Sequence, residues 1–335
     1  MQIQFPPLMK NNVSIYCILF LLSFFTKLDA QVICGYDLGR TDSVKAKLFQ
    51  AEEEKLNRAI QVQIAKDRSN RTASGQIRSQ SSGKLKANST TLPPTVYIPV
   101  VYHIIDADPF SITDAMVQAS LDDLNRAYAH QGAYSVDPLG EDTRIQFRLA
   151  QRTPTGEKSN GINRIKSFYD SVDVDLEDAA LKSQIQWDPS RYANIWVVKK
   201  INGEIQPSRF ECGQWTRMAY GGYASAGGGM VVAGLSTAVL AHEMGHYLSL
   251  LHTFQGTNCA NNDCSVDGDR ICDTPPDRSI LGSPCNNPEN SCGTDTLSGP
   301  FTVDVPDNIS NFMDYGTSCP TVFTPGQGER MRAFL

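Results

Sequence analysis

Apolar residues follow two different periodicities in the chain after Pro94. Residues 96–105 (VYIPVVYHII) form a nearly continuous apolar, β-branched run, which is typical of a strand buried on both faces. Residues 114–128 repeat apolar side chains at the spacing of one helical face, and Thr113 is available as N-cap. Residues 145–149 alternate apolar and polar positions, as a half-buried strand does. The pattern predicts a strand, a helix and a second strand.

Two further apolar runs and one helix complete the predicted domain. Residues 195–198 (IWVV) and the glycine-flanked run 230–232 indicate short strands, and a helix capped by Ser236-Thr237 follows. After His252 the periodicity fades, and residues 258–311 contain prolines, glycines and cysteines throughout. Strands and helices in this order are typical of an α+β fold.

The N-terminal residues have the composition of a targeting segment. Lys10 precedes the apolar run 13–25, and Leu28-Asp29-Ala30 ends in a small residue suited to cleavage. Thirteen apolar residues fall short of the roughly 20 that span a bilayer. We therefore expect a signal peptide over residues 1–30, secretion of the protein, and no membrane contact after cleavage.

The composition of the chain changes from Thr41 to Pro94, where a charged stretch leads into a polar one. The stretch 45–68 is charged and potentially helical, whereas residues 71–95 are rich in Ser, Gly, Lys and Arg and predict a linker. The linker is either a processing region or a flexible connection. The basic residues that would suit a processing protease are Arg71, Arg78, Lys84 and Lys86.

Charge and cysteine content narrow the functional class. The net charge of -6 arises from 30 basic and 36 acidic residues that are interspersed, so no nucleic-acid footprint exists. The chain has nine cysteines. Cys17 leaves with the signal peptide, and six of the others lie between Cys259 and Cys319. In an oxidising compartment this density predicts disulfides that cross-link a loop-rich region.

The stretch LAHEMGHYLSLLH, residues 240–252, carries the candidate chemistry. His242 and His246 lie four residues apart in the predicted helix, so both imidazoles share a face at a separation suited to one tetrahedral metal. Glu243 is placed to act as general base on a metal-activated water. His252 can become the third ligand if the chain turns after Leu248. The spacing predicts a zinc site.

One residue of this motif departs from the usual pattern, and the histidines outside the motif lack ligand spacing. In the pattern HExxHxxGxxH a glycine makes the turn, whereas this chain has Ser249, and a non-glycine residue in the left-handed region costs about 1–2 kcal/mol. The remaining histidines, His103 and His130, have no partners at ligand spacing and are interpreted as structural.

Several motifs in this order resemble the pappalysin-type metzincin metalloendopeptidases, especially their bacterial, cytophagalysin-like members. The resemblance runs from about Val96 to the end of the chain. It implies an α+β upper lobe with a mixed twisted sheet and helices, an irregular disulfide-rich lower lobe, and an active-site cleft between them. It also implies a propeptide over residues 31–94 and a catalytic domain over residues 95–335. The motifs are HEMGHYLSLLHTF, DRICDTPP (269–276), NFMDY (311–315) and FTPGQ (323–327).

The resemblance assigns roles to individual residues. Met313 is similar to the methionine of the Met-turn, an apolar floor below the zinc, and Tyr315 to the tyrosine that stabilises the oxyanion of the reaction. Cys34-Gly35 is similar to a cysteine switch, in which a thiolate occupies the zinc and keeps the enzyme latent. The alternative for Cys34 is a disulfide with Cys212.

The resemblance also implies structural sites in the lower lobe. A calcium ion would be held by Asp269, Thr274 and the carbonyl of Ile271, where carboxylates and other oxygens are the expected ligands. Family members that cut before basic residues carry an acid just after the Met-turn tyrosine. Residues 316–318 (GTS) hold no carboxylate, so a basic preference is not implied. The implied disulfides are Cys285 with Cys319, Cys264 with Cys292, and Cys259 with Cys272.

Together these patterns predict a secreted zinc endopeptidase that acts on proteins or peptides and is made as a latent zymogen. His242, His246 and His252 hold the metal, and Glu243 moves the proton. The substrate would lie along an edge strand of the upper lobe, for which residues 230–232 are the candidate. Two alternatives are a metzincin-fold binding module silenced at Ser249, and a metal hydrolase that acts on a non-peptide bond.

Overall fold

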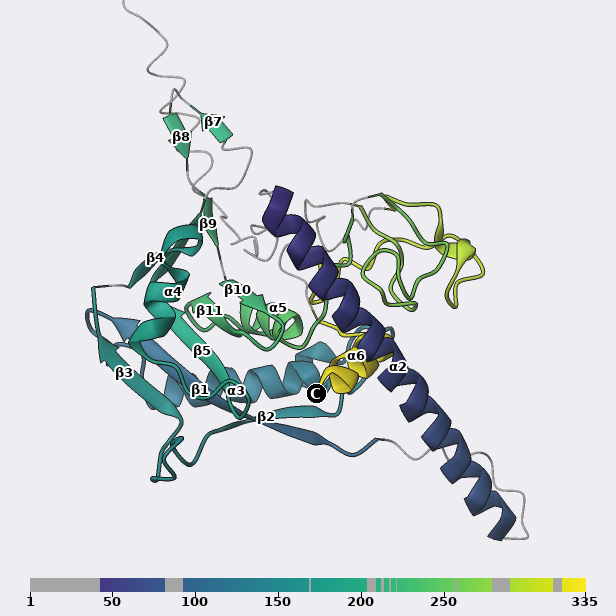
Figure 1. Ribbon diagram of the computed structural model, residues 1–335, viewed down its shortest axis with the longest axis horizontal. Coiled ribbons are helices and arrows are strands. Elements are labelled where there is room, and N and C mark those ends of the chain that lie inside the picture. Colours follow the sequence, from purple (N-terminus) through teal and green to yellow (C-terminus); the bar gives the residue numbers. More distant parts are fainter. Residues whose placement is uncertain are drawn as a thin grey trace, which may run out of the picture.

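The computed structural model of this chain describes most of the residues after the N-terminal segment, and its elements are labelled in Figure 1. The described residues are 43–81, 93–168, 170–203, 209–211, 214–216, 218–220, 222–256, 258–278, 290–315 and 321–335. The predicted signal peptide, Cys34 and Cys212 lie outside them.

A six-stranded mixed sheet forms the centre of the fold. Its order is β10-β11-β5-β1-β2, with β3 also paired to β1, and all of these pairs are parallel except β10 with β11. Every residue of β1 from Val100 to Ile105 is buried, so this part of the apolar run is covered on both faces as expected, whereas Tyr97 and Pro99 are exposed. The strands are β1 Val96–Asp106, β2 Ile145–Leu149, β3 Ile162–Lys166, β5 Ala193–Val198, β10 Gly222–Ser225 and β11 Gly229–Ala233.

Helices cover both faces of this sheet. Helices α3 (Asp114–Tyr128) and α5 (Thr237–Tyr247) pack side by side and share one core with the even-numbered residues of β1 (Figure 1). Helix α4 (Val174–Gln184) lies on the other face, where Leu181 packs near Trp196. Thr113 caps α3 by accepting from the Met116 N–H, as predicted. This arrangement confirms the α+β class.

Smaller elements complete the upper lobe. A three-stranded sheet pairs β4 (Ser171–Asp173), β6 (Lys200–Gly203) and β9 (Met218–Tyr220). Strands β7 (Arg209–Glu211) and β8 (Gln214–Thr216) form a separate hairpin, and η2 (Gly132–Tyr134) is a single 3₁₀ turn.

The lower lobe consists mainly of loops, from residue 253 to the C-terminal helix. Its described part contains the 3₁₀ turn η3 (Asp295–Leu297) and two disulfides. Helix α6 (Pro325–Phe334) follows this lobe and begins with Thr324 as N-cap and proline at the first position. Gln327 completes a capping box, which fixes the start of α6.

Helix α2 (Ser43–Ser81) is much longer than the predicted helical stretch and crosses α6 (Figure 1). The prediction of a linker from residue 71 was therefore wrong as far as Ser81, because Arg71 and its neighbours continue the helix. Arg71 makes an ion pair in this helix, so it is a poor processing site. Among the described helices, none combines the length and hydrophobicity needed to cross a membrane.

The prediction that residues 230–232 form an edge strand was also wrong. Strand β11 lies between β10 and β5, and its Met230, Val231 and Val232 are fully buried. An apolar run covered on both faces is the mark of an interior strand. Strand β10 ends the described sheet on this side.

Candidate active site

Helix α5 carries the first two histidines toward the lower lobe. His242 and His246 are four residues apart and fully or almost fully buried. Ser236 is the N-cap residue, but its side chain makes no capping hydrogen bond. Thr237 instead donates to Asp123 of α3 at 2.6 Å, which ties the start of α5 to its neighbouring helix. The predicted helix is confirmed, while its cap differs from the prediction.

The chain reverses directly after this helix. Helix α5 ends at Tyr247, Leu248 is the C-cap, and Ser249 has φ of 73°. The Ser249 amide donates to the His246 carbonyl, so the turn is closed tightly onto the last turn of the helix. This left-handed residue takes the place of the expected glycine and brings His252 back toward α5.

The three histidines converge on one point. Nε2 of His246 lies 3.1 Å from Nε2 of His242 and 3.1 Å from Nε2 of His252, and the third separation is 3.3 Å. Nitrogen ligands of a tetrahedral zinc ion, bound at about 2.0–2.1 Å, lie about 3.3 Å apart. The three side chains are buried and form a candidate metal site.

Backbone carbonyls fix how two of the rings are protonated. His242 Nδ1 is 2.6 Å from the Phe312 carbonyl, and His246 Nδ1 is 2.9 Å from the Leu250 carbonyl. A carbonyl only accepts hydrogen bonds, so each Nδ1 carries the proton and each Nε2 presents a lone pair. Lone pairs that face one another at this distance repel unless a cation lies between them, so the donor set fits a divalent metal such as zinc.

Glu243 lies beside the first ligand and is fully buried. It packs against Gly222 in β10: a Cβ atom on Gly222 would lie 2.7 Å from Glu243 Cγ and 2.9 Å from its Oε1. The glycine therefore leaves the room in which the carboxylate sits. This contact was not predicted, because residues 21 positions apart in sequence meet only through the packing of α5 on the sheet.

The segment around Met313 forms a turn that packs against α5. Met313 is fully buried, and a Cβ on Gly245 would collide with its sulfur atom. Asn311 Oδ1 accepts from the Met313 N–H at 2.9 Å, and the Met313 carbonyl accepts from the Thr253 N–H at 3.2 Å. Gly245, between the two helical histidines, is thus needed for Met313 to approach. The sequence gives no local signal for this role of Gly245, because the contact joins the helix to a segment distant in the chain.

Tyr315 follows two residues later and lies over the histidines. Its ring centroid is 5.0 Å from His252 and 5.8 Å from His242. Phe254 stacks on His252 at 4.6 Å and contacts Tyr315 at 4.8 Å. The aromatic residues enclose the third ligand from one side, and Tyr315 is half-buried at the edge of the site.

The predicted calcium ligands also lie together. Asp269 Oδ2 accepts from the Thr274 hydroxyl at 2.8 Å, and this hydroxyl is 3.1 Å from the Ile271 carbonyl. Burial raises the pKa of Asp269 to about 8. A small pocket beside these three residues is also lined by Asn261, Asp267 and Asp277.

The disulfide pairing differs from the prediction. Cys259 bonds to Cys292, and Cys264 bonds to Cys272, whereas Cys264–Cys292 and Cys259–Cys272 were expected. Four cysteines allow three pairings, and spacing alone does not choose among them. Here a tight loop brings Cys264 within a Cα distance of 4.9 Å of Cys272, eight residues on. Cys285 and Cys319 lie outside the described residues.

Fold and site together define a class of protein. A helix that carries two histidines and an intervening glutamate, a left-handed turn to a third histidine, and a buried methionine turn below it are the parts of a metzincin-type metallohydrolase.

Comparisons with known proteins agree with this class. A family model described as pregnancy-associated plasma protein-A matches residues 175–335. An extracellular metalloprotease 1 of Coccidioides posadasii is 29% identical over 230 residues, 66% of this chain and 68% of that protein. An extracellular metalloprotease of Arthroderma otae is 27% identical over 229 residues, 66% of this chain and 70% of that protein.

Solved structures give the same result. Mature mirolysin of Tannerella forsythia, in complex with a cleaved peptide, is 25% identical with a TM-score of 0.53, covering 72% of this chain and 92% of that chain. A promirolysin variant of this organism is 26% identical with a TM-score of 0.53, covering 72% of this chain and 81% of that chain. The family model, the relatives and the solved structures together support a pappalysin-type metzincin metalloprotease. Similarity to these metalloproteases, together with the three converging histidines, implies a catalytic zinc.

Proposed function

We propose that this protein is a secreted zinc-dependent endopeptidase in which His242, His246 and His252 hold the metal and Glu243 is the general base. The observation that carries the proposal is the convergence of three imidazole Nε2 atoms within 3.3 Å beside a buried carboxylate. A zinc ion bound there supplies Lewis acidity, which polarises a peptide carbonyl and makes a water molecule acidic near neutral pH.

The side chains around the metal move the proton and stabilise charge. Glu243 takes a proton from the attacking water and returns it to the leaving amine nitrogen. Gly222 and the buried surroundings keep this carboxylate in one position, so little reorganisation is needed during the reaction. Tyr315, with its ring over His242 and His252, donates a hydrogen bond to the carbonyl oxygen as that oxygen gains negative charge. Met313 supports α5 below the ligands.

The substrate is a protein or peptide bound in extended form along β10. This strand ends the described sheet and runs beside Glu243 through Gly222. An edge strand offers free backbone groups, to which an extended peptide adds by main-chain hydrogen bonds. The mirolysin neighbour in complex with a cleaved peptide supports this class of substrate. We infer no preference for a basic residue after the cut.

Secretion and latency complete the proposal. The relatives named extracellular metalloproteases support export by the predicted signal peptide over residues 1–30. A propeptide over residues 31–94 keeps the enzyme latent, with Cys34 as the cysteine switch. The promirolysin neighbour supports the zymogen, while Cys34 itself lies outside the described residues.

A calcium ion at Asp269, Thr274 and the Ile271 carbonyl stabilises the lower lobe. Burial raises the pKa of Asp269 to about 8, and a divalent cation offsets this cost because it favours the ionised carboxylate. Calcium should raise the melting temperature of the wild type and leave that of Asp269→Asn unchanged. Equal shifts in both proteins would place the ion elsewhere.

The proposed activity is tested with the full-length chain and its isosteric variant Glu243→Gln. Both are loaded with zinc and incubated with a mixed peptide library, before and after limited proteolysis of the N-terminal segment. Mass spectrometry then maps every cut. Cuts made by the wild type alone support the endopeptidase. No cuts from a folded, zinc-bound, processed wild type would leave the silenced binding module.

A further inference from the structure

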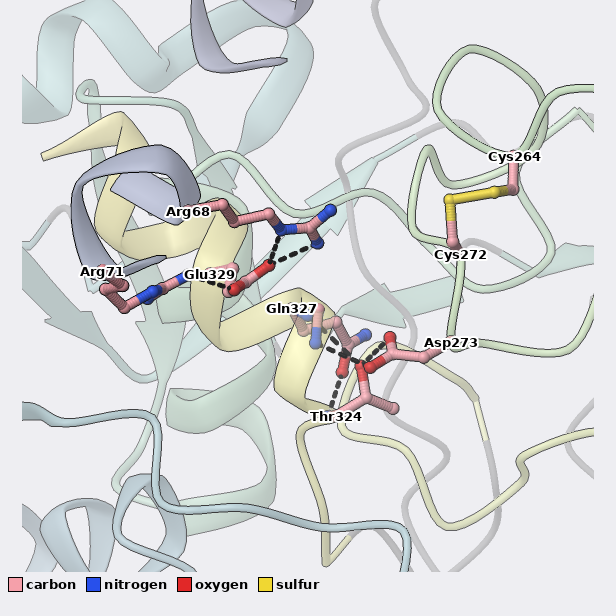
Figure 2. A network of polar contacts seen from close by, with 9 residues as sticks. Arg68, Arg71, Cys264, Cys272, Asp273, Thr324, Gln327 and Glu329 are labelled. Carbon is pink, nitrogen blue, oxygen red and sulfur yellow. Dashed lines mark hydrogen bonds and ion pairs between the residues drawn. A yellow bond between two sulfur atoms is a disulfide. The ribbon is translucent and has the colours of Figure 1, made fainter. Parts of the chain in front are cut away.

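Helix α2 presents one continuous face to the rest of the molecule. Asn57 is 5% exposed and Ile60 is 2% exposed, and Glu53 and Arg71 are half-buried, whereas Arg58 lies on the exposed side. With the half-buried Ile64 and Asp67 between Ile60 and Arg71, these positions recur every three or four residues, as one face of a helix does. The face lies on α6 (Figures 1 and 2), and hydrogen bonds join it to the loop from Cys264 to Cys272.

Ion pairs join this face to α6. Arg68 and Arg71, one turn apart, bind the two oxygens of Glu329, each at 2.6 Å (Figure 2). Burial alone would raise the pKa of Glu329, but the two guanidinium groups hold this pKa below its usual value. A carboxylate between two arginines is a specific attachment point, because it selects a helix with basic residues at this spacing.

Hydrogen bonds join the same face to the lower lobe. The side-chain amides of Asn57 and Gln61 both donate to the Ser265 carbonyl, at 3.2 and 3.4 Å. Arg270 donates to the Glu53 carbonyl at 3.3 Å. Helix α2 therefore bridges α6 and a lower-lobe loop.

One contact leads on toward the metal ligands. Arg330 is 1% exposed and donates through Nη1 to Asn57 Oδ1 at 2.7 Å. Its Nε donates to the Ser249 carbonyl at 2.9 Å. Ser249 is the left-handed residue between His246 and His252. A single buried guanidinium thus links helix α2 to the turn that places the third histidine.

We propose that α2 docks on a surface formed by Glu329, Arg330 and the Ser265 carbonyl. In this docked state Asn57 acts through Arg330 as a positioning residue for the His246–His252 turn. The coupling rests on the proposed role of His252 as ligand; the docking does not. A cut after Ser81 alone would leave α2 bound to the domain. Release of α2 loosens the turn that carries His252.

Hydrogen exchange of the full-length Glu243→Gln chain tests the docking without any need for activity. The double variant Arg68→Glu with Arg71→Glu should speed exchange of the α2 amides by at least ~10-fold, because two attractions to Glu329 become repulsions. The matched control is Arg58→Glu, whose side chain is 70% exposed, and it should change exchange by less than ~2-fold. Adding Glu329→Arg to the double variant should restore most of the protection. Unchanged exchange in the double variant would refute the docking surface.

The coupling is tested with Asn57→Ala against Gln61→Ala. Both variants lose a bond to the Ser265 carbonyl, but only Asn57 contacts Arg330. Asn57→Ala should speed exchange of the Leu248 and Leu250 amides, which bond to α5 carbonyls, by ~3-fold or more. It should also weaken zinc binding, measured by chelator competition. Equal behaviour of the two variants would refute the coupling. A chain that docks α2 normally but cuts no peptide would refute the proposed activity alone.

Discussion

Ser249 is expected to cost this protein stability, and replacing it by glycine tests this. Its φ of 73° lies in the left-handed region, where a Cβ atom costs about 1–2 kcal/mol. Its hydroxyl is buried and has no hydrogen-bond partner within the described part of the chain, which adds about 1–3 kcal/mol. Glycine gains freedom in the unfolded state, which offsets about 0.5–1 kcal/mol. Ser249→Gly should therefore raise the free energy of unfolding by about 1–4 kcal/mol.

Urea unfolding in the presence of EDTA measures this change without any contribution from bound metal. Ser249→Ala separates the two causes, because alanine removes the hydroxyl and keeps the left-handed strain. The free energy of unfolding should rank glycine above alanine and alanine above serine. A less stable glycine variant would refute the reasoning, since it would mean that the serine side chain contributes an interaction that the turn needs.

Three further predictions concern the packing below the ligands, a buried histidine and a disulfide. Gly245→Ala should weaken zinc binding and lower the melting temperature, because the new Cβ displaces Met313; a higher melting temperature would contradict this contact. Burial lowers the pKa of His103 to about 4, so the unfolded state binds the extra proton and stability falls by roughly 3 kcal/mol as pH drops from about 6.5 to 4. His103→Gln should flatten this fall in a pH series of urea titrations. Cys259→Ser with Cys292→Ser should cost about 3–4 kcal/mol, since the disulfide closes a loop of 33 residues, and calorimetry measures the loss.

The elements that the sequence predicted well are those with local causes. Helix α3 was predicted with its bounds and its cap because apolar spacing and Thr113 act within one segment. The turn at Ser249 was predicted because the histidine spacing leaves no other route to a common point. The three histidines could be named from their spacing alone, since ligand geometry constrains positions along the chain.

The elements that the sequence did not predict depend on contacts between distant segments. The position of β11 inside the sheet is set by β10, which pairs with it after a short turn. Helix α2 continues past the predicted helical stretch, and Arg71 in this continuation pairs with Glu329, which lies 258 residues later. The cysteine pairs depend on how a loop without periodicity folds. None of these causes is present in the local pattern of the segment concerned.

Helix α6 supports the metal site although it lies far from the histidine motif in the sequence. The Gln327 side chain and Asn311 exchange two hydrogen bonds of 2.9 Å, and Asn311 holds the N–H of Met313 below the ligands. Arg330, one turn later on the same helix, holds the Ser249 carbonyl. A single C-terminal helix thus supports both the floor of the site and the turn to its third ligand. A change that unwinds α6 should therefore abolish zinc binding without touching any histidine, and circular dichroism with zinc titration of Met331→Pro, in the interior of the helix, would show both losses together.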